Sequence, residues 1–294
     1  MTSVEITLVL LSALLHAVWS TSIKASGDPL SFNLLQGGVT LVLGASVLPF
    51  IDYAALPSGL WKWLALSCLA HGVYAYWLSR AFEHGDLTLV YPIARSTPAI
   101  LPLVAVPLLG EHITAGGALG IGVVVAGMWL VQVGARLAWN AFSSPATRFA
   151  VLTLASTVAY SLSDKAAMTE LAAEPVPGGL PPVLVFYVLM SVGHFVPFVP
   201  LVLLHRGARA VAAAARKDLV AASVASLIGF LGYGLILKTL ETAPASYVVA
   251  VRQTSVLFVL VLGIVRLHER PGRARILGAA VTVVGVALIA WLGK

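Results

Sequence analysis

AVWSTSIKA at residues 17–25 returns 141 residues later as VAYSLSDKA at residues 158–166. Trp19 is matched by Tyr160, and both stretches continue with two serines and a lysine at the same spacing. Weak internal symmetry of this kind indicates a chain built from two related units. The fold must therefore be one that a repeated unit can form.

The match continues through the later part of each unit at a larger offset of 158 residues. The matched pairs are Arg80 and Lys238, Glu83 and Glu241, Glu111 and Glu269, Gly120 and Gly278, and Gly127 and Gly285. The second unit thus carries 17 extra residues, which we assign to loops at 169–181 and 205–218.

The composition identifies lipid as the main surroundings of the fold. Of 294 residues, 59% are hydrophobic and 10% are charged, whereas soluble domains average about 25% charged residues. The net charge of +6 comes from basic residues in short loops, so we expect no nucleic-acid partner. The single cysteine, Cys68, excludes a disulfide framework and a cysteine-based metal site. We expect no metal and no cofactor.

Ten segments are long enough to cross a membrane, because crossing takes about 20 apolar residues as a helix. They lie at 4–25, 30–51, 61–82, 86–108, 112–134, 148–168, 182–204, 217–239, 244–265 and 273–293. Backbone polar groups in lipid must satisfy one another, which leaves helix as the only structure for such runs. The predicted fold class is an all-α polytopic membrane protein with ten transmembrane helices.

The repeat divides these helices into two units of five. We place the first repeat at 1–137, a connecting loop at 138–147 and the second repeat at 148–294. Because five is odd, the second unit must cross the membrane in the opposite sense. This inverted repeat is typical of carriers, whose substrate site lies near the midplane between the halves.

Several motifs, taken in order, resemble the drug/metabolite transporter superfamily, in particular its ten-helix EamA-type exporters. They are HAVWSTSIKA at 16–25, YWLSRAFEHGDLTLVYPIARSTPAILPL at 76–103, Gly110-Glu111, GALGIGVVVAGMWLV at 117–131 and GAAVTVVGVALIAWL at 278–292. Each motif alone is weak, but together they cover nearly the whole chain. The resemblance implies export of amino acids, drugs or other metabolites across the cell inner membrane.

The orientation of the chain in the membrane has two conflicting predictions. The resemblance implies that both termini lie in the cytoplasm. The charges predict the reverse, because twelve lysines and arginines fall on the side opposite the termini and four fall beside them. Both orientations therefore stay open.

Arg95 is the sharpest candidate for a binding role. It lies about nine residues, or roughly 13 Å, into the predicted helix 86–108, on the same face as Tyr91. Burying an arginine there costs about 2.5 to 3.5 kcal/mol, so it should face a cavity or a partner. It could bind a substrate carboxylate, or bond structurally to helix carbonyls. The repeat places Gln253 at the equivalent position, beside Arg252.

Other polar and aromatic residues recur at helical spacing on six further predicted helices and at Trp77. The candidates for substrate binding are His16, Trp19, Asn33, Gln36, His71, Tyr74, Trp77, Tyr160, Tyr187, His194 and Tyr233. One wet cavity explains these faces together. For any single residue, an interhelical hydrogen bond or an interface aromatic explains it equally well.

The remaining ionisable residues have competing interpretations. With an ordinary pKa near 6.5, an intramembrane histidine could carry protons for antiport, or could simply donate a structural hydrogen bond. Asp164 and Lys165 indicate a local charge pair, or a side chain that snorkels to the end of the helix. Glu111 and Glu269 are predicted to cap the helices that they begin.

The glycines of the predicted helices 112–134 and 273–293 allow close approach of helix backbones. They fit the periphery of the bundle, or a dimer contact, and we expect a monomer.

Three functions remain, and the first is favoured. It is a secondary carrier for amino acids, including aromatic ones, or similar small amphipathic metabolites, with protons as a candidate coupling ion. A passive channel is the second. An intramembrane enzyme is the third, and it is disfavoured because the sequence has no HExxH, GxSxG, P-loop or CxxC pattern.

Overall fold

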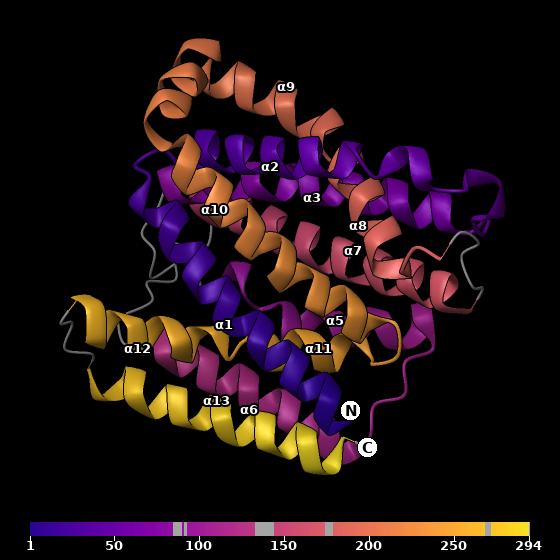
Figure 1. The fold of residues 1–294 in the computed structure, drawn as a ribbon. Coiled ribbons are helices and arrows are strands. Elements are labelled where there is room, and N and C mark those ends of the chain that lie inside the picture. The colour runs from indigo at the N-terminus through magenta and orange to yellow at the C-terminus, as the bar shows by residue number, and fades with distance from the viewer. Residues whose placement is uncertain (85–89, 91–92, 133–143, 174–178, 268–271, 294) are drawn as a thin grey trace.

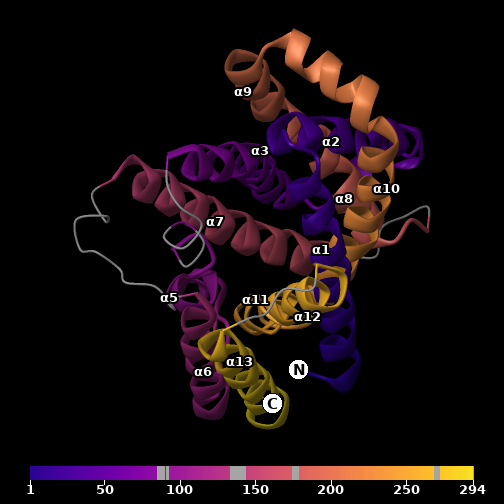
Figure 2. The ribbon, with the colours of Figure 1, turned by 90° about the vertical axis from the view of Figure 1, so that its left-hand side faces the viewer.

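A computed structural model describes residues 1–84, 90, 93–132, 144–173, 179–267 and 272–293, which contain helices and no strand. The α-helices are α1 (Ser3–Ala25), α2 (Pro29–Ala45), α3 (Leu60–His84), α5 (Thr97–Leu109), α6 (Ala115–Gln132), α7 (Pro145–Ala173), α8 (Pro182–Gly193), α9 (Phe195–Arg206), α10 (Ala208–Leu240), α11 (Ala245–Arg252), α12 (Ser255–Leu267) and α13 (Arg273–Leu292). Two short 3-10 helices, η1 (Leu48–Phe50) and η2 (Tyr53–Ala55), follow α2. Figure 1 and Figure 2 show these helices as one bundle.

The helices confirm the predicted fold class. Each of the ten predicted spans holds at least one described helix. Within the described part of the chain, five segments are long and apolar enough to cross a membrane. They are Ser3–Ile23, Pro29–Phe50, Pro182–Arg206, Ala208–Leu240 and Arg273–Leu292. The amino group of Met1 donates to the carbonyl oxygen of Gly293 at 3.2 Å, so both chain ends lie together, as an even number of crossings requires.

The extra residues of the second repeat are helical to a larger extent than predicted. Helix α7 continues to Ala173 and α10 begins at Ala208, so much of both predicted loops is helix. The sequence ARAVAAAARK at 208–217 is rich in alanine, the best helix former, which explains why α10 begins before its apolar run.

The packing of the helices follows the inverted repeat. Helix α7 is the repeat counterpart of α1, and α10 is the counterpart of α3. Accordingly, α3 packs along α7 while α10 packs along α1. In both pairs, the third helix of one repeat thus packs against the first helix of the other repeat. The core therefore lies between the halves, with α7 crossing the middle of the bundle in Figure 2.

Helices α6 and α13 lie side by side at one edge of the bundle in both views. A β-carbon on Gly285 would lie 2.9 Å from the carbonyl oxygen of Gly120, and one on Gly278 would lie 2.6 Å from that of Gly127. Gly120 matches Gly278 and Gly127 matches Gly285 in the repeat. Exchanging the two repeats therefore converts one contact into the other, as at a two-fold axis. We call this contact the glycine seam.

Glu111 joins the halves in a way that the sequence did not predict. It does not cap its own helix, because α6 begins four residues later at Ala115. Its carboxylate instead accepts hydrogen bonds from the backbone N–H groups of Ala245 and Ser246, at the start of α11 in the second repeat. The prediction that Glu111 caps a helix is therefore correct, but the capped helix is α11 and not α6. Glu269 lies outside the described residues.

An ion-pair cluster joins the halves at the end of the bundle away from the termini. Arg206 Nε lies 3.2 Å from Asp28 Oδ1, and Arg206 Nη2 lies 3.1 Å from Glu83 Oε1. His205 Nε2 lies 3.0 Å from Glu83 Oε1. Arg80 Nη1 lies 2.7 Å from Glu83 Oε2. The cluster therefore ties the end of α9 to the end of α3 and to the start of α2.

Candidate functional site

Asp164, in the middle of α7, is the centre of a buried polar cluster. Its side chain is 0% exposed. Ser67 Oγ donates to Asp164 Oδ1 at 2.5 Å. The second carboxylate oxygen, Oδ2, lies 3.1 Å from His71 Nε2 and accepts a hydrogen bond from the hydroxyl of Tyr233. Three helices, α3, α7 and α10, thus meet at one carboxylate, and they come from both repeats.

Aromatic rings surround this carboxylate. The His71 ring stacks on Tyr160 with centroids 4.1 Å apart, and Tyr74 meets Tyr160 edge to face at 5.7 Å. The ring centroids of Tyr187 and Tyr233 lie 5.8 Å apart. These five residues were predicted as candidates on four different helices, and the structure brings them together. Asp164 and these five rings are called the central cluster below.

Two arginines lie in the second half of the repeats, and one of them, Arg252, contacts the central cluster. The guanidinium carbon of Arg252 lies 5.6 Å from the centroid of the Tyr233 ring, within the range of a cation–π contact. Arg95 Nη1 donates to Ser255 Oγ at 3.3 Å, so the arginine of the first repeat contacts the second. The charges of Arg95 and Arg252 both act on the His16 ring.

The backbone is interrupted at equivalent positions near both arginines. In the first repeat, Arg95 and Ser96 interrupt the helix before α5 begins at Thr97. In the second, Gln253 and Thr254 separate α11 from α12. Gln253 is 8% exposed, and its Oε1 has no hydrogen-bond partner among the described residues. Broken helices at corresponding positions of two repeats are typical of substrate sites in carriers.

A second group of predicted residues lies on α1 and α2. Trp19 Nε1 donates to Gln36 Oε1 at 2.8 Å, and the His16 ring lies 5.0 Å from the Trp19 ring. Trp19 also packs against Gly229 of α10. Asn33 is half-buried, one turn before Gln36 on α2. This group therefore lines the contact between α1, α2 and α10.

Three predicted residues have other surroundings. Trp77 stacks on Phe149, with centroids 5.8 Å apart. His194 Nδ1 pairs with the carbonyl oxygen of Met190 in the preceding turn at 3.2 Å. Tyr91 lies outside the described residues. The first two side chains are therefore engaged in packing and in a local hydrogen bond.

The predicted charge pair of Asp164 with Lys165 is wrong. Lys165 Nζ donates to the carbonyl oxygen of Leu240 at 2.8 Å, whereas Asp164 bonds to Ser67, His71 and Tyr233. Neighbouring residues on a helix point about 100° apart, so they do not face each other. The sequence signal that could have identified Asp164 is a carboxylate within a long helix whose neighbours are small serines.

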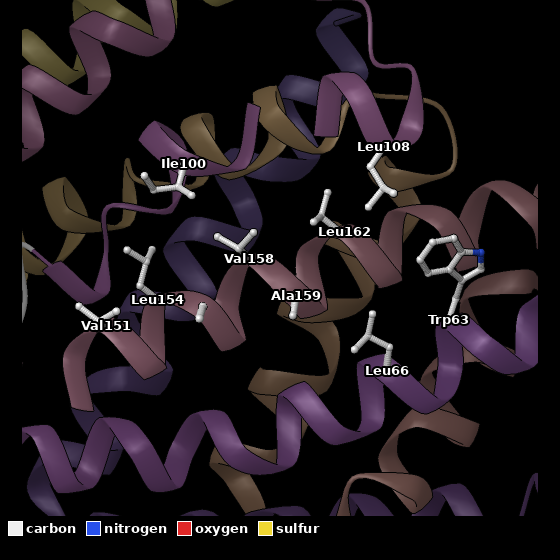
Figure 3. A pocket seen from close by; sticks show the side chains of 10 residues that line it. Trp63, Leu66, Ile100, Leu108, Val151, Leu154, Val158, Ala159 and Leu162 are labelled. Carbon is white, nitrogen blue, oxygen red and sulfur yellow. The ribbon is translucent and has the colours of Figure 1, made fainter. Parts of the chain in front are cut away.

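A separate cavity of about 480 Å³ lies away from the central cluster, between α3, α5 and α7 (Figure 3). Its lining is apolar and consists of Trp63, Leu66, Ile100, Leu108, Val151, Leu154, Ala155, Val158, Ala159 and Leu162. Leu108 and Val151 are 56% and 49% exposed. This crevice is thus on the outer surface of the bundle. No group of three or more metal-ligating side chains occurs in the part of the chain that the structure describes.

The comparisons with known proteins agree with this architecture. The EamA-like transporter family matches residues 3–133 and 165–291, in two stretches that follow the two repeats. A solved crystal structure covers 100% of this chain and 98% of its own, with 16% identity and a TM-score of 0.73, and it shows the same fold. No curated protein matches the sequence. With most of its length matched, the chain belongs to the EamA-like transporter family and is a multi-pass membrane transporter of the drug/metabolite type.

Proposed function

We propose that the chain is a secondary carrier that exports amino acids, or similar small amphipathic metabolites, across the cell inner membrane by alternating access. The repeats at 1–137 and 148–294 are the two moving units, and the segment 138–147 connects them. The proposal is supported by a central cluster to which both repeats contribute. A site shared in this way changes its access when one half rocks against the other.

The substrate class is inferred from the paired helix breaks. Each break has an arginine beside it, Arg95 in the first repeat and Arg252 in the second. An arginine binds a carboxylate through two parallel hydrogen bonds. The helix starts after the two breaks lie close together, because Arg95 donates to Ser255 at the start of α12, and the start of a helix carries partial positive charge. A carboxylate-bearing substrate is therefore favoured.

Aromatic residues would bind the rest of the substrate. Tyr74, Tyr160, Tyr187 and Tyr233 surround the centre, and Trp19 lies on α1. Such rings bury apolar surface while their polar atoms keep hydrogen-bond partners. An aromatic amino acid fits this composition. The other predicted residues, His16, Asn33, Gln36, His71, His194, Gln253, Trp77 and Tyr91, are proposed to complete the lining.

Counterflow in proteoliposomes tests the proposal. Vesicles are loaded with unlabelled L-phenylalanine, and entry of labelled L-phenylalanine is followed without any ion gradient. A carrier accumulates label transiently and saturates with concentration. Flux that neither saturates nor shows counterflow indicates the channel instead. Absence of counterflow for every amino acid removes the proposed substrate class.

Arginine variants test the carboxylate site. Arg95→Ala should lower the affinity for L-phenylalanine by about 10- to 100-fold, because a charged hydrogen bond contributes about 1.5 to 3 kcal/mol. Arg95→Lys should restore only part of it, since lysine lacks the paired donors. Arg209→Ala is the matched control, because Arg209 is exposed on α10. Unchanged affinity in Arg95→Ala would remove the assigned role.

A further inference from the structure

We propose that Asp164, together with His71, binds either a proton or the ammonium group of the substrate, and thereby couples export to proton entry. The inference rests on the carrier function proposed above, and it extends that function by naming the coupling ion and the second recognition group. It assigns a role to Asp164, which has none in the proposed binding of the substrate by the arginines and the aromatic rings.

In the described structure, the buried charge of Asp164 is balanced by a titratable side chain and not by a permanently charged one. A fully buried carboxylate needs a fixed counter-charge or a proton, because burial of an isolated charge is costly. Within the described part of the chain, the ion-pair partner of Asp164 is His71. Arg252 lies over the ring of Tyr233, and the hydroxyl of that ring bonds to Asp164. Arg252 thus contacts the ring of Tyr233, and it forms no ion pair with Asp164 among the described residues.

One proton makes the pair of Asp164 and His71 neutral overall. Without that proton the pair carries one negative charge, which a cation must compensate inside the bilayer. Histidine is the side chain whose charge changes near neutral pH. The ammonium group of an amino acid is a cation of the required sign. A proton and a substrate ammonium therefore compete for the same place.

The separation of charges in the site matches a zwitterion. Asp164 accepts a hydrogen bond from the hydroxyl at the edge of the Tyr233 ring, and Arg252 lies over that ring. A substrate with an ammonium group and a carboxylate can place each against the opposite charge. Several titratable or polar groups surround the pair. They are Ser67, Cys68 and Tyr74 from α3, Tyr160 from α7, Tyr187 from α8, His194 between α8 and α9, Tyr233 from α10 and Arg252 from α11.

The repeat contains this site once. At the repeat offsets, Asp164 corresponds to Ile23 and His71 corresponds to Gly229. The first repeat therefore has no second carboxylate at the matching position. One proton is then exchanged for one substrate in each cycle. A proton from water on one side binds to His71 Nε2 or Asp164 Oδ2, and it is released to water on the other side when a substrate ammonium replaces it.

Binding of labelled L-phenylalanine to the purified full chain at a series of pH values tests the competition. In the wild type, acidification below the titration of the pair should weaken binding by about tenfold per pH unit, as linkage requires. Asp164→Asn should bind weakly and show no such dependence, and Asp164→Glu should restore it. Asp218→Asn is the matched control, because Asp218 lies near the start of α10, far along the helix from Tyr233. The same pH dependence in Asp164→Asn as in the wild type would overturn the proposal.

Two further measurements separate this proposal from the carrier function. Infrared difference spectra on acidification, recorded without substrate, should show a carboxylic acid band that Asp164→Asn lacks and Asp218→Asn keeps. If the band is absent from the wild type and Asp164→Asn binds with an unchanged pH dependence, the proton site is wrong even where counterflow succeeds. If counterflow fails while the band is present, the carrier function is wrong and the proton site stands. Accumulation driven by a sodium gradient and not by a pH gradient would also overturn the proposal.

Discussion

Gly278 of α13 packs so closely against Gly127 of α6 that a β-carbon on Gly278 would lie 2.6 Å from the Gly127 carbonyl oxygen. No side chain can be added here without separating the two helices. We expect Gly278→Leu to lower the midpoint of thermal unfolding in detergent, because overpacking costs about 1 to 3 kcal/mol. Gly122→Leu is the control, since nothing lies within 4 Å of its added β-carbon. Equal midpoints for the two variants would contradict the seam.

Removal of the Glu111 carboxylate should weaken the contact between the repeats. In Glu111→Ala, two N–H groups at the start of α11 lose their acceptor in a buried place. An unsatisfied buried donor costs about 1 to 3 kcal/mol. The expected result is a lower unfolding midpoint. Glu170→Ala is the control and should change the midpoint little, because, among the described residues, the Glu170 carboxylate accepts a hydrogen bond from Trp63 Nε1 at 3.1 Å and none from the backbone at a helix start. A variant as stable as the wild type would show that the cap is dispensable.

The ion-pair cluster should depend on acid in a defined direction. Burial raises the pKa of Glu83, but the hydrogen bond and charge of His205 and the charges of Arg206 and Arg80 outweigh it, so this pKa lies below its ordinary value of 4.5. A lowered carboxyl pKa stabilises the folded state above the unfolded pKa, and the stabilisation disappears as the pH falls through the folded pKa.

Unfolding midpoints of the wild type, Glu83→Gln, Arg206→Gln and the double variant measure this coupling. At pH 7 we expect a coupling free energy of about 0 to 1 kcal/mol, because the groups are partly exposed. The coupling should begin to decrease below pH 4.5 and should vanish only when the pH has fallen below the lowered pKa of Glu83 in the folded state. A coupling that grows on acidification would contradict the assigned pairing.

Tyr233 contacts Asp164 through its hydroxyl and Arg252 through its ring, and two variants separate these contacts. Tyr233→Phe removes the hydroxyl and should cost about 0.5 to 1.5 kcal/mol of stability. Tyr233→Leu also removes the ring, and should cost about 0.5 to 2 kcal/mol more. Thermal unfolding of both variants checks the order. If the two are equally stable, the contact with Arg252 contributes nothing.

Much of the fold follows from the sequence for a clear physical reason. Lipid requires continuous apolar helices, so each span can be recognised in the sequence as a run of apolar residues. The internal repeat then predicts that the second unit crosses the membrane in the opposite sense. The ends of α7 and α10 were less predictable, because the polar helix beyond the apolar run follows from helix propensity and not from lipid. The glycines predicted a peripheral place for α6 and α13, but the packing of these two helices against each other is seen only in the structure.

The centre of the site was harder to predict. Separate helical faces indicated His71, Tyr160 and Tyr233 correctly as polar or aromatic stripes. Asp164 shares a predicted helical face with Tyr160, but it was paired with its neighbour Lys165 and not named as a binding residue, because its actual partners lie 97, 93 and 69 residues away. Contacts of this kind depend on which helices adjoin across the two repeats. The periodicity of a single helix does not contain that information.

The carboxylate at the centre belongs to the second repeat alone, and Ile23 stands in its place in the first. A chain made by joining two copies of the first repeat would keep glycines for its seam but would have no acid at its middle. On the coupling proposed above, such a protein could still open to each side but would have no carboxylate with which to exchange a proton for a substrate. In that proposal, the single aspartate is what allows a proton gradient to drive the exchange.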